Sequence, residues 1–151
     1  MEKISFRLSD DYADVAAIHD ALYTWNLTKT GGERVAVQAQ RFPEQAAFLA
    51  CDDSGAAHGG IAFHWLNDPR RVFVDYFFLD DAVRGTGVGR KIMQFFMDWA
   101  ERNGAREIEL TTNSFQAPEF YRKMGFEITE SKKEPQPLRP DNLHYFLRKV
   151  L

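Results

Sequence analysis

Short runs that either alternate between hydrophobic and polar residues or are apolar throughout occur along this chain, and longer runs with helical spacing lie between them. Alternation with a period of two is typical of strands, whereas apolar residues three and four apart indicate one face of a helix. The pattern predicts strands at residues 4–8, 46–51, 58–66, 72–80, 106–112, 125–131 and 143–151. It predicts helices at residues 10–27, 33–42, 88–104 and 117–124.

Turn-forming and capping residues separate these elements. Ser9 and Asp10 offer side-chain oxygens to the start of the first helix, and Gly104 suits the position just after the third. Pro118 suits the first turn of the last helix. The sequence DDSGAA at residues 52–57 joins two apolar strands and predicts an antiparallel hairpin. A hairpin followed by strand–helix–strand units predicts an α/β or α+β fold with a central mixed sheet.

Composition narrows the class of protein. The 151 residues, 44% of them hydrophobic, suit one domain spanning residues 1–151. A net charge of −3 gives no support for a nucleic-acid or membrane-surface partner. Cys51 is the single cysteine, so no internal disulfide can form. The chain starts without a signal-peptide pattern and has no apolar run near the roughly 20 residues that span a bilayer, so we expect a cytoplasmic protein.

Three glycines at alternating positions, Gly85, Gly87 and Gly89, stand between a strand and an amphipathic helix. The first amides of a helix lack intrahelical acceptors, and they bind phosphate groups well where no side chain obstructs the approach. Arg84, Arg90 and Lys91 add positive charge there. The stretch therefore predicts a phosphate site. It fits neither G-x-x-x-x-G-K-[ST] nor G-x-G-x-x-G, the loops of two common nucleotide-binding folds.

The pattern R-x-x-G-x-G, formed by Arg84, Gly87 and Gly89, resembles the pyrophosphate loop of the GCN5-related N-acetyltransferases (GNAT). A second element of that family lies downstream, at the expected spacing: Ala117, Tyr121, Gly125 and Phe126. The resemblance implies a GNAT-like fold, with a mostly antiparallel sheet of about seven strands and flanking helices.

The resemblance implies that acetyl-CoA (coenzyme A) is the cosubstrate. The end of the strand before the glycines would pair with the pantetheine amides like an added strand, and the Phe77 amide would polarise the thioester carbonyl. The family often has Asn where this chain has Ser114. The expected cofactor-binding residues are Phe77, Phe78, Leu79, Arg84, Gly85, Thr86, Gly87, Val88, Gly89, Arg90 and Ser114.

Asp75 is the candidate general base. Strand alternation places it on the face of Phe73, Phe77 and Leu79, and a lone carboxylate among aromatic rings is costly unless it is paired or functional. Some members of the resembling family carry an acidic residue at the matching place. An equally weighted alternative is a structural Asp75 paired with His64 on the neighbouring strand. Glu107 and Glu109 are weaker candidates for the base.

Tyr121 is the candidate acid for the leaving sulfur, a role that the resemblance gives to this residue. The alternative is an aromatic packing residue whose hydroxyl orients the sulfur. Cys51 lies in an apolar strand and is expected in the core. The four histidines show no metal-ligand spacing, so we predict no metal.

Less specific expectations concern the amine acceptor. Tyr23, Trp25 and Asn26 end the first helix, and the loop after it commonly forms part of the acceptor pocket in the resembling family; the alternative is that the aromatic residues pack in the core. His64 or Trp65 could face the acceptor. The proline-containing loop at residues 134–141 either covers the site or serves a dimer contact. A homodimer is common in that family, and the sequence leaves it open.

The leading hypothesis is an N-acetyltransferase that moves an acetyl group from acetyl-CoA directly to a primary amine in a ternary complex. The acceptor is either a small molecule or a peptide. One alternative is a non-catalytic acyl-CoA-binding or sensing domain. A second is a nucleotide-dependent enzyme, which would bind NAD or ATP in place of coenzyme A.

Overall fold

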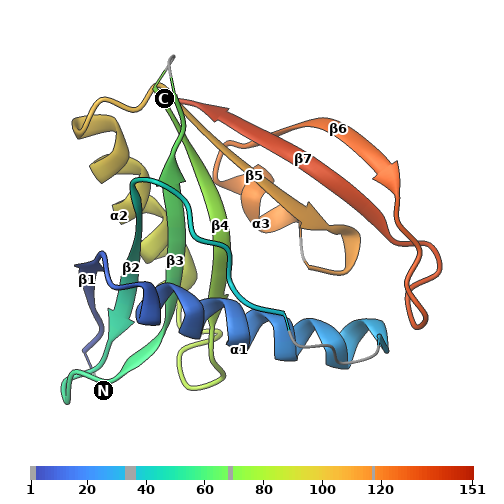
Figure 1. The fold of residues 1–151 in the computed structure, drawn as a ribbon, viewed down its shortest axis with the longest axis horizontal. Coiled ribbons are helices and arrows are strands. Elements are labelled where there is room, and N and C mark those ends of the chain that lie inside the picture. Colours follow the sequence, from blue (N-terminus) through green and yellow to red (C-terminus); the bar gives the residue numbers. More distant parts are fainter. Residues whose placement is uncertain (1–2, 33–36, 68–69, 117) are drawn as a thin grey trace.

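A computed structural model describes residues 3–32, 37–67, 70–116 and 118–151. All of the predicted strands are confirmed, and they form one seven-stranded sheet with the order β1-β2-β3-β4-β5-β7-β6 (Figure 1). The strands are β1 (Ser5–Ser9), β2 (Gln45–Cys51), β3 (Ala57–Trp65), β4 (Arg71–Leu79), β5 (Glu107–Asn113), β6 (Glu127–Lys133) and β7 (Leu143–Val150). The helices are α1 (Tyr12–Thr30), α2 (Val88–Arg102), α3 (Pro118–Lys123) and a 3₁₀ turn, η1 (Ser114–Gln116).

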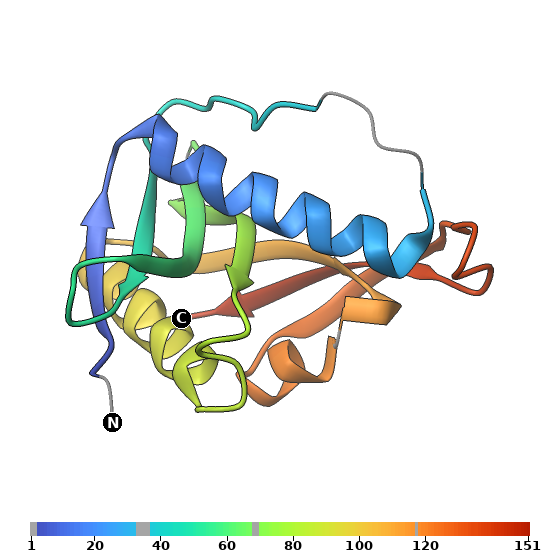
Figure 2. The same ribbon diagram turned by 90° about the horizontal axis from the view of Figure 1, so that it is seen from below.

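The sheet separates two layers of helix. Figure 2 shows α1 across one face, with α2 and α3 on the opposite face. The larger core cluster lies between the sheet and α2, around Phe63, Ile92 and Phe96. A smaller cluster joins Val15 and Ile18 of α1 to the sheet and includes the other strand residues Ala47, Leu49, Cys51 and Ala62. Cys51 is therefore in the core, as predicted.

Helix α1 begins and ends slightly later than the sequence predicts. Asp11, not Ser9 or Asp10, is the N-cap, and its side chain accepts a hydrogen bond from the Ala13 amide at 2.9 Å. The Ser9 hydroxyl instead donates to Asp14 at 2.6 Å, so it ties the end of β1 to the first helical turn. The helix continues to Thr30 and stops where Gly31 adopts a left-handed conformation, with φ 69°.

The predicted helix at 33–42 is wrong for its described part, because residues 37–42 are not helical. Residues 33–36 lie outside the described residues. Side chains from other elements bind the main chain of this segment: Tyr12 donates to the Ala39 carbonyl, and the Gln40 amide donates to the Tyr76 hydroxyl at 3.2 Å. These long-range bonds take the place of the i to i−4 bonds that a helix would need.

The fold opens between β4 and β5, the one parallel pair in the described sheet. Their pairing runs only from Arg71 with Glu107 to Phe73 with Glu109, although β4 continues to Leu79 and β5 to Asn113. Beyond Phe73 the two strands diverge, as Figure 1 shows. The β5-facing edge of residues 74–79 therefore has no strand partner among the described residues.

A β-bulge at Asp75 lies just beyond that point. Ala62 of β3 pairs with Tyr76 and Phe63 pairs with Val74, so Asp75 is an extra residue on β4. A bulge inserts one residue and reverses the later alternation. Val74 and Phe77 consequently both pack into the α2-side core. The predicted shared face of Asp75 with Phe77 and Leu79 is therefore wrong.

Candidate active site

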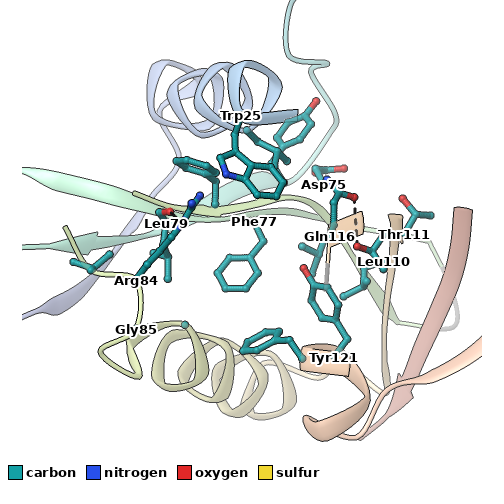
Figure 3. Close-up of a pocket in the computed structure, with 18 residues that line it drawn as sticks. Trp25, Asp75, Phe77, Leu79, Arg84, Gly85, Leu110, Thr111, Gln116 and Tyr121 are labelled. Carbon is teal, nitrogen blue, oxygen red and sulfur yellow. Dashed lines mark hydrogen bonds between the residues drawn. The ribbon is translucent and has the colours of Figure 1, made fainter. Parts of the chain in front are cut away.

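A cavity of about 450 Å³ occupies the opening between β4 and β5. Helix α1 closes one side of it, and the α2 N-terminal loop and α3 close the other (Figure 3). Some of the site residues that the sequence predicts do line this cavity: Asp75, Phe77, Phe78, Leu79, Arg84, Gly85, Gly89 and Tyr121. Trp25, which the sequence suggests for the acceptor pocket, lines it as well. The lining residues that the sequence did not predict are Leu22, Val74, Tyr76, Val83, Leu110, Thr111, Thr112, Gln116 and Phe120.

The glycine stretch forms a row of unpaired amides, residues 85–90, which we call the amide row. Within the described part of the chain, these amides donate to no main-chain carbonyl or side chain; the first helical bond to this region runs from Lys91 to the Gly87 carbonyl. Gly85 and Gly87 have φ of 76° and 84°, and a Cβ on either would meet nothing within 4 Å. The row is therefore open to a ligand and sits at the positive end of α2.

The side chains of the amide row make structural contacts or face solvent. The Thr86 hydroxyl donates to the Val83 carbonyl, which tightens the turn, and Val88 is buried in the core. Arg90 is exposed on α2. Thr86, Gly87, Val88 and Arg90 do not line the cavity itself, so any contact of theirs with a ligand would come from the outer side of the loop.

Arg84 connects the loop to both neighbouring layers. Its Nε donates to the Leu79 carbonyl at 2.7 Å, and its Nη1 lies 3.3 Å from Asp81. The guanidinium carbon lies 4.9 Å from the Phe78 ring centre and 5.3 Å from that of Trp25 (Figure 3). Arg84 thus spans the cavity mouth from the end of β4 to α1.

Asp75 and His64 form a buried pair. His64 Nδ1 lies 2.9 Å from both Asp75 carboxylate oxygens, and Gln45 Nε2 is 3.5 Å from one of them. Only 4% of the Asp75 side chain is exposed, and this burial raises its pKa above 3.8 although the His64 hydrogen bond opposes the shift. The pairing that the sequence offered as an alternative exists, and the carboxylate also lines the cavity.

Tyr121 stands on α3 opposite Asp75. Its ring meets those of Phe77, Phe120 and Phe126, and Figure 3 shows its hydroxyl pointing into the cavity. Among the described residues the hydroxyl has no hydrogen-bond partner. Burial raises the pKa of the phenol far above 10, so Tyr121 keeps its proton at neutral pH.

Ser114 does not line the cavity. Its hydroxyl donates to Asn142 at 3.0 Å and accepts from the Leu143 amide at 3.1 Å, so it fastens η1 to the start of β7. Gln116, two residues later, lines the cavity instead. Its side-chain oxygen accepts from the Asn113 amide at 2.9 Å, and its Nε2 donates to Asn26 of α1 at 2.8 Å. No motif marks this residue, because its role depends on η1 meeting α1.

The remaining candidates from the sequence lie mostly outside the cavity. Neither Glu107 nor Glu109 lines the cavity; Glu107 pairs with Arg148 and Glu109 with Arg71. His64, Trp65, Tyr23 and Asn26 do not line it either, although Asn26 accepts a hydrogen bond from Gln116, which does. Ala117 of the second family element lies outside the described residues.

The loop between β6 and β7 docks on the end of α1. The Leu138 amide donates to the Thr30 carbonyl at 2.8 Å, and Arg139 Nε donates to the Lys29 carbonyl at 3.1 Å. The loop therefore caps the helix that carries Trp25 and Asn26. Across the described ranges, no group of His, Cys, Asp or Glu side chains could hold a metal ion, and no helix is long and apolar enough to cross a bilayer.

Comparisons with known proteins agree with this geometry. The model of the acetyltransferase (GNAT) family matches residues 12–126. The chain is 30% identical over 109 residues to blasticidin-S acetyltransferase of Streptomyces morookaense, which covers 69% of this chain and 76% of that protein. A GCN5-related N-acetyltransferase from Kribbella flavida has a similar structure, with a TM-score of 0.73, 18% identity and 98% coverage of both chains. A NatC complex bound to Gag peptide and CoA gives a TM-score of 0.69, 18% identity and 99% coverage of both chains.

Proposed function

Because this chain belongs to the acetyltransferase (GNAT) family, we propose that it transfers the acetyl group of acetyl-CoA to a primary amine. The transfer is direct, within a complex that holds both substrates. One observation carries the proposal: the amide row borders, through Gly85 and Gly89, one end of a cavity whose other end holds a buried carboxylate and an unpaired phenol. The first group suits a pyrophosphate, and the other two suit proton transfer at an amine and a sulfur.

The residues present fit acetyl-CoA. The amides of residues 85–90 can bind the pyrophosphate, and the absence of side chains on Gly85 and Gly87 leaves the approach clear. The unpaired edge of β4 at Phe77–Leu79 can bind the pantetheine amides as an added strand. When bound, acetyl-CoA supplies the acetyl thioester that is transferred.

Asp75 takes the proton of the incoming amine. A lysine-like amine has a pKa of about 10.4 and must lose a proton before it can attack. The buried Asp75 carboxylate has a raised pKa, which makes it a stronger base than an exposed aspartate. His64, at 2.9 Å, holds the carboxylate in place and favours its charged form.

Tyr121 supplies a proton to the departing sulfur. Its phenol is protonated at neutral pH, burial raises its pKa further, and the hydroxyl has no competing partner among the residues described. A main-chain amide near Phe77 is the candidate donor to the thioester oxygen, and loss of one such donor typically costs about 10²–10³ in rate. No step needs a nucleophilic cysteine, and Cys51 is buried in the α1-side core.

The acceptor is a small molecule or a peptide with a free amine. Similarity to blasticidin-S acetyltransferase favours the small molecule. A peptide with a free amine is the second candidate acceptor, because the NatC structure, which shares this fold, is bound to a Gag peptide. The Trp25 ring and the apolar side chain of Leu22 offer a wall against which a ring or an alkyl group can pack.

A panel of amines tests the proposal. The protein is mixed with acetyl-CoA and polyamines, nucleoside antibiotics, aminoglycosides, amino acids or short peptides, and the release of free thiol is followed. We expect release with at least one amine. Acetyl-CoA binding without release for any amine would instead support the non-catalytic binding domain, and binding of NAD or ATP in its place would support a nucleotide-dependent enzyme.

A further inference from the structure

His58 lies between two carboxylates at the base of the loop that carries the amide row. Its Nε2 is 2.7 Å from Asp52 Oδ2 and its Nδ1 is 2.9 Å from Asp80 Oδ2. A neutral imidazole has one donor nitrogen, whereas an imidazolium has two. With both carboxylates ionised, only the imidazolium satisfies both contacts. The geometry therefore favours a charged His58.

Asp80 organises the turn that leads to the amide row. Its Oδ1 accepts from the Ala82 amide at 3.0 Å, and its carbonyl accepts from the Val83 and Arg84 amides, both at 3.2 Å. Its own amide donates to the His58 carbonyl at 2.9 Å. Residue 80 is thus held from two sides, by the main chain and by the imidazole of His58.

Asp52 is a fixed anchor on the other side of His58. Its Oδ1 accepts from the Ser54 hydroxyl at 2.6 Å and from the amides of Ser54 and Ala56 at 2.8 and 3.1 Å. These bonds, with that from His58, hold the pKa of Asp52 well below 3.8. Asp52 therefore stays charged and keeps its second oxygen directed at His58.

We propose that His58 is a positioning residue for the coenzyme A site, which as an imidazolium links the β2–β3 turn to Asp80 and so fixes the start of the amide row. This inference rests on the proposed function. His58 also neutralises one of the two carboxylates, and so lowers the negative charge beside a site for a pyrophosphate. Once His58 loses its proton, Asp80 loses its cationic partner. The turn after β4 is then no longer held by an ion pair to the β2–β3 turn.

The charged groups around His58 determine how the affinity for acetyl-CoA should change with pH. Asp52 faces it from the turn after β2, Asp80 from the end of β4, and Asp14 of α1 lines a cavity of about 170 Å³ with His58 and Asp80. All are acidic. The hydrogen bonds with Asp52 and then with Asp80 raise the pKa of His58 above 6.5. The two carboxylate contacts and this upward shift both favour the imidazolium, so acetyl-CoA should bind more weakly as the pH rises through that raised pKa.

Calorimetric titration of acetyl-CoA between about pH 7 and pH 9 tests the proposal, since phosphate monoesters titrate near pH 6 and acetyl-CoA has no free thiol. For the unaltered protein we expect Kd to rise about three- to fivefold across this range, the size of a partly exposed ion pair. H58Q keeps a donor but cannot carry charge, so it should bind more weakly at pH 7 and show a flat profile. H144Q is the matched control, because His144 also faces a carboxylate, Glu134 at 3.2 Å, and should keep the original profile.

A second pair of variants covers the case in which H58Q does not fold. D52N removes one carboxylate from His58, so the rise in Kd should move to lower pH; D53N makes the same charge change one residue away and should leave the profile in place. The role of His58 would be overturned if H58Q kept both the wild-type affinity at pH 7 and the wild-type pH profile. It would also be overturned if the rise in Kd occurred at the same pH in D52N as in the unaltered protein. Neither result would contradict the proposed function. Failure of the unaltered protein to bind acetyl-CoA would overturn the proposed function as well.

Discussion

The two ends of the cavity are built from different parts of the chain. At the α2 end, the groups available to a ligand are consecutive main-chain amides at residues 85–90. At the other end they are single side chains from separate elements, Asp75 on a bulge of β4 and Tyr121 on α3. The α2 end therefore depends on a local conformation that one segment can adopt, whereas the other end depends on how distant elements pack.

This difference predicts how each end responds to substitution. A main-chain amide survives a change of its side chain, so the α2 end should be sensitive mainly where glycine conformation matters. Asp75 and Tyr121 each provide a group that no neighbour can replace. We therefore expect losses in kcat at the side-chain end and losses in acetyl-CoA affinity at the main-chain end.

Tyr121→Phe should have the largest effect. It removes the hydroxyl but keeps the ring against Phe77 and Phe126, so kcat should fall by about 10²-fold or more, a typical value for a lost general acid. The Kd of acetyl-CoA should change little. Tyr145→Phe makes the same chemical change on β7, outside the cavity, and should leave kcat unaltered. An unaltered kcat in Tyr121→Phe would remove the acid role.

Asp75→Asn should lower kcat/KM by about 10²-fold if the carboxylate is the base. The unaltered enzyme should lose activity as the pH falls through the raised pKa of Asp75, and the variant should lack this limb of the pH–rate profile. Glu109→Gln, which breaks an ion pair outside the cavity, should keep the limb. If the limb persists in Asp75→Asn, Asp75 is only the structural partner of His64.

The same substitution makes a separate prediction for stability. The pKa of Asp75 is higher in the folded chain than the value of 3.8 expected in the unfolded chain. At a pH above 3.8 the unfolded chain therefore loses this proton more readily, and ionisation of Asp75 lowers the free energy of unfolding. Asp75→Asn removes that penalty and keeps a side chain of the same shape. Thermal unfolding at neutral pH should therefore show a Tm no lower than that of the unaltered protein. A clear drop would mean that the pair with His64 stabilises the fold by more than the cost of burying the charge.

Gly87→Ala tests the main-chain end and should have a smaller effect. A left-handed conformation costs a non-glycine residue about 1–2 kcal/mol, so we expect the Kd of acetyl-CoA to rise by about tenfold. No atom lies within 4 Å of the added Cβ, so the loss would come from conformation and not from a clash within the protein. Gly104→Ala, at φ 97° beyond α2, carries a similar strain and should leave Kd unchanged. Equal Kd values for the two variants would contradict the role of the amide row.

Gln116→Ala should have the smallest effect. It breaks the bond from Gln116 Nε2 to Asn26, so KM for the acceptor should rise about threefold, within the range of one hydrogen bond, while the Kd of acetyl-CoA stays the same. In a double-mutant cycle with Asn26→Ala, the two losses should not add. Additive increases in KM would show that the hydrogen bond between Gln116 and Asn26 does not position the α1 residues that line the acceptor side of the cavity.

Local chemistry explains which features could be predicted from the sequence. The strands follow from short apolar or alternating runs bounded by turn residues, the glycine loop from its glycine spacing, and the start of α3 at Pro118 from the preference of proline for a first helical turn. Each depends on residues near one another in the chain.

The features that could not be predicted depend on tertiary contacts. Alternation placed Asp75 on the wrong face because a bulge leaves no mark in the hydrophobic pattern. Residues 37–42 look helical but are bound through Tyr12 and Tyr76. Ser114 was expected at the cofactor and is instead fastened to Asn142, while Gln116 reaches the cavity because η1 turns the chain toward α1.

The most direct test of direct acetyl transfer uses acetyl-CoA with an isotope label in the acetyl group. The protein is incubated with the amine panel, and mass spectrometry follows both the amines and the protein. The account predicts the labelled acetyl group on the nitrogen of at least one amine and none on the protein, with product formation greatly slowed in Tyr121→Phe. Labelled acetyl on the protein as an intermediate, or bound acetyl-CoA with no labelled amine, would contradict it.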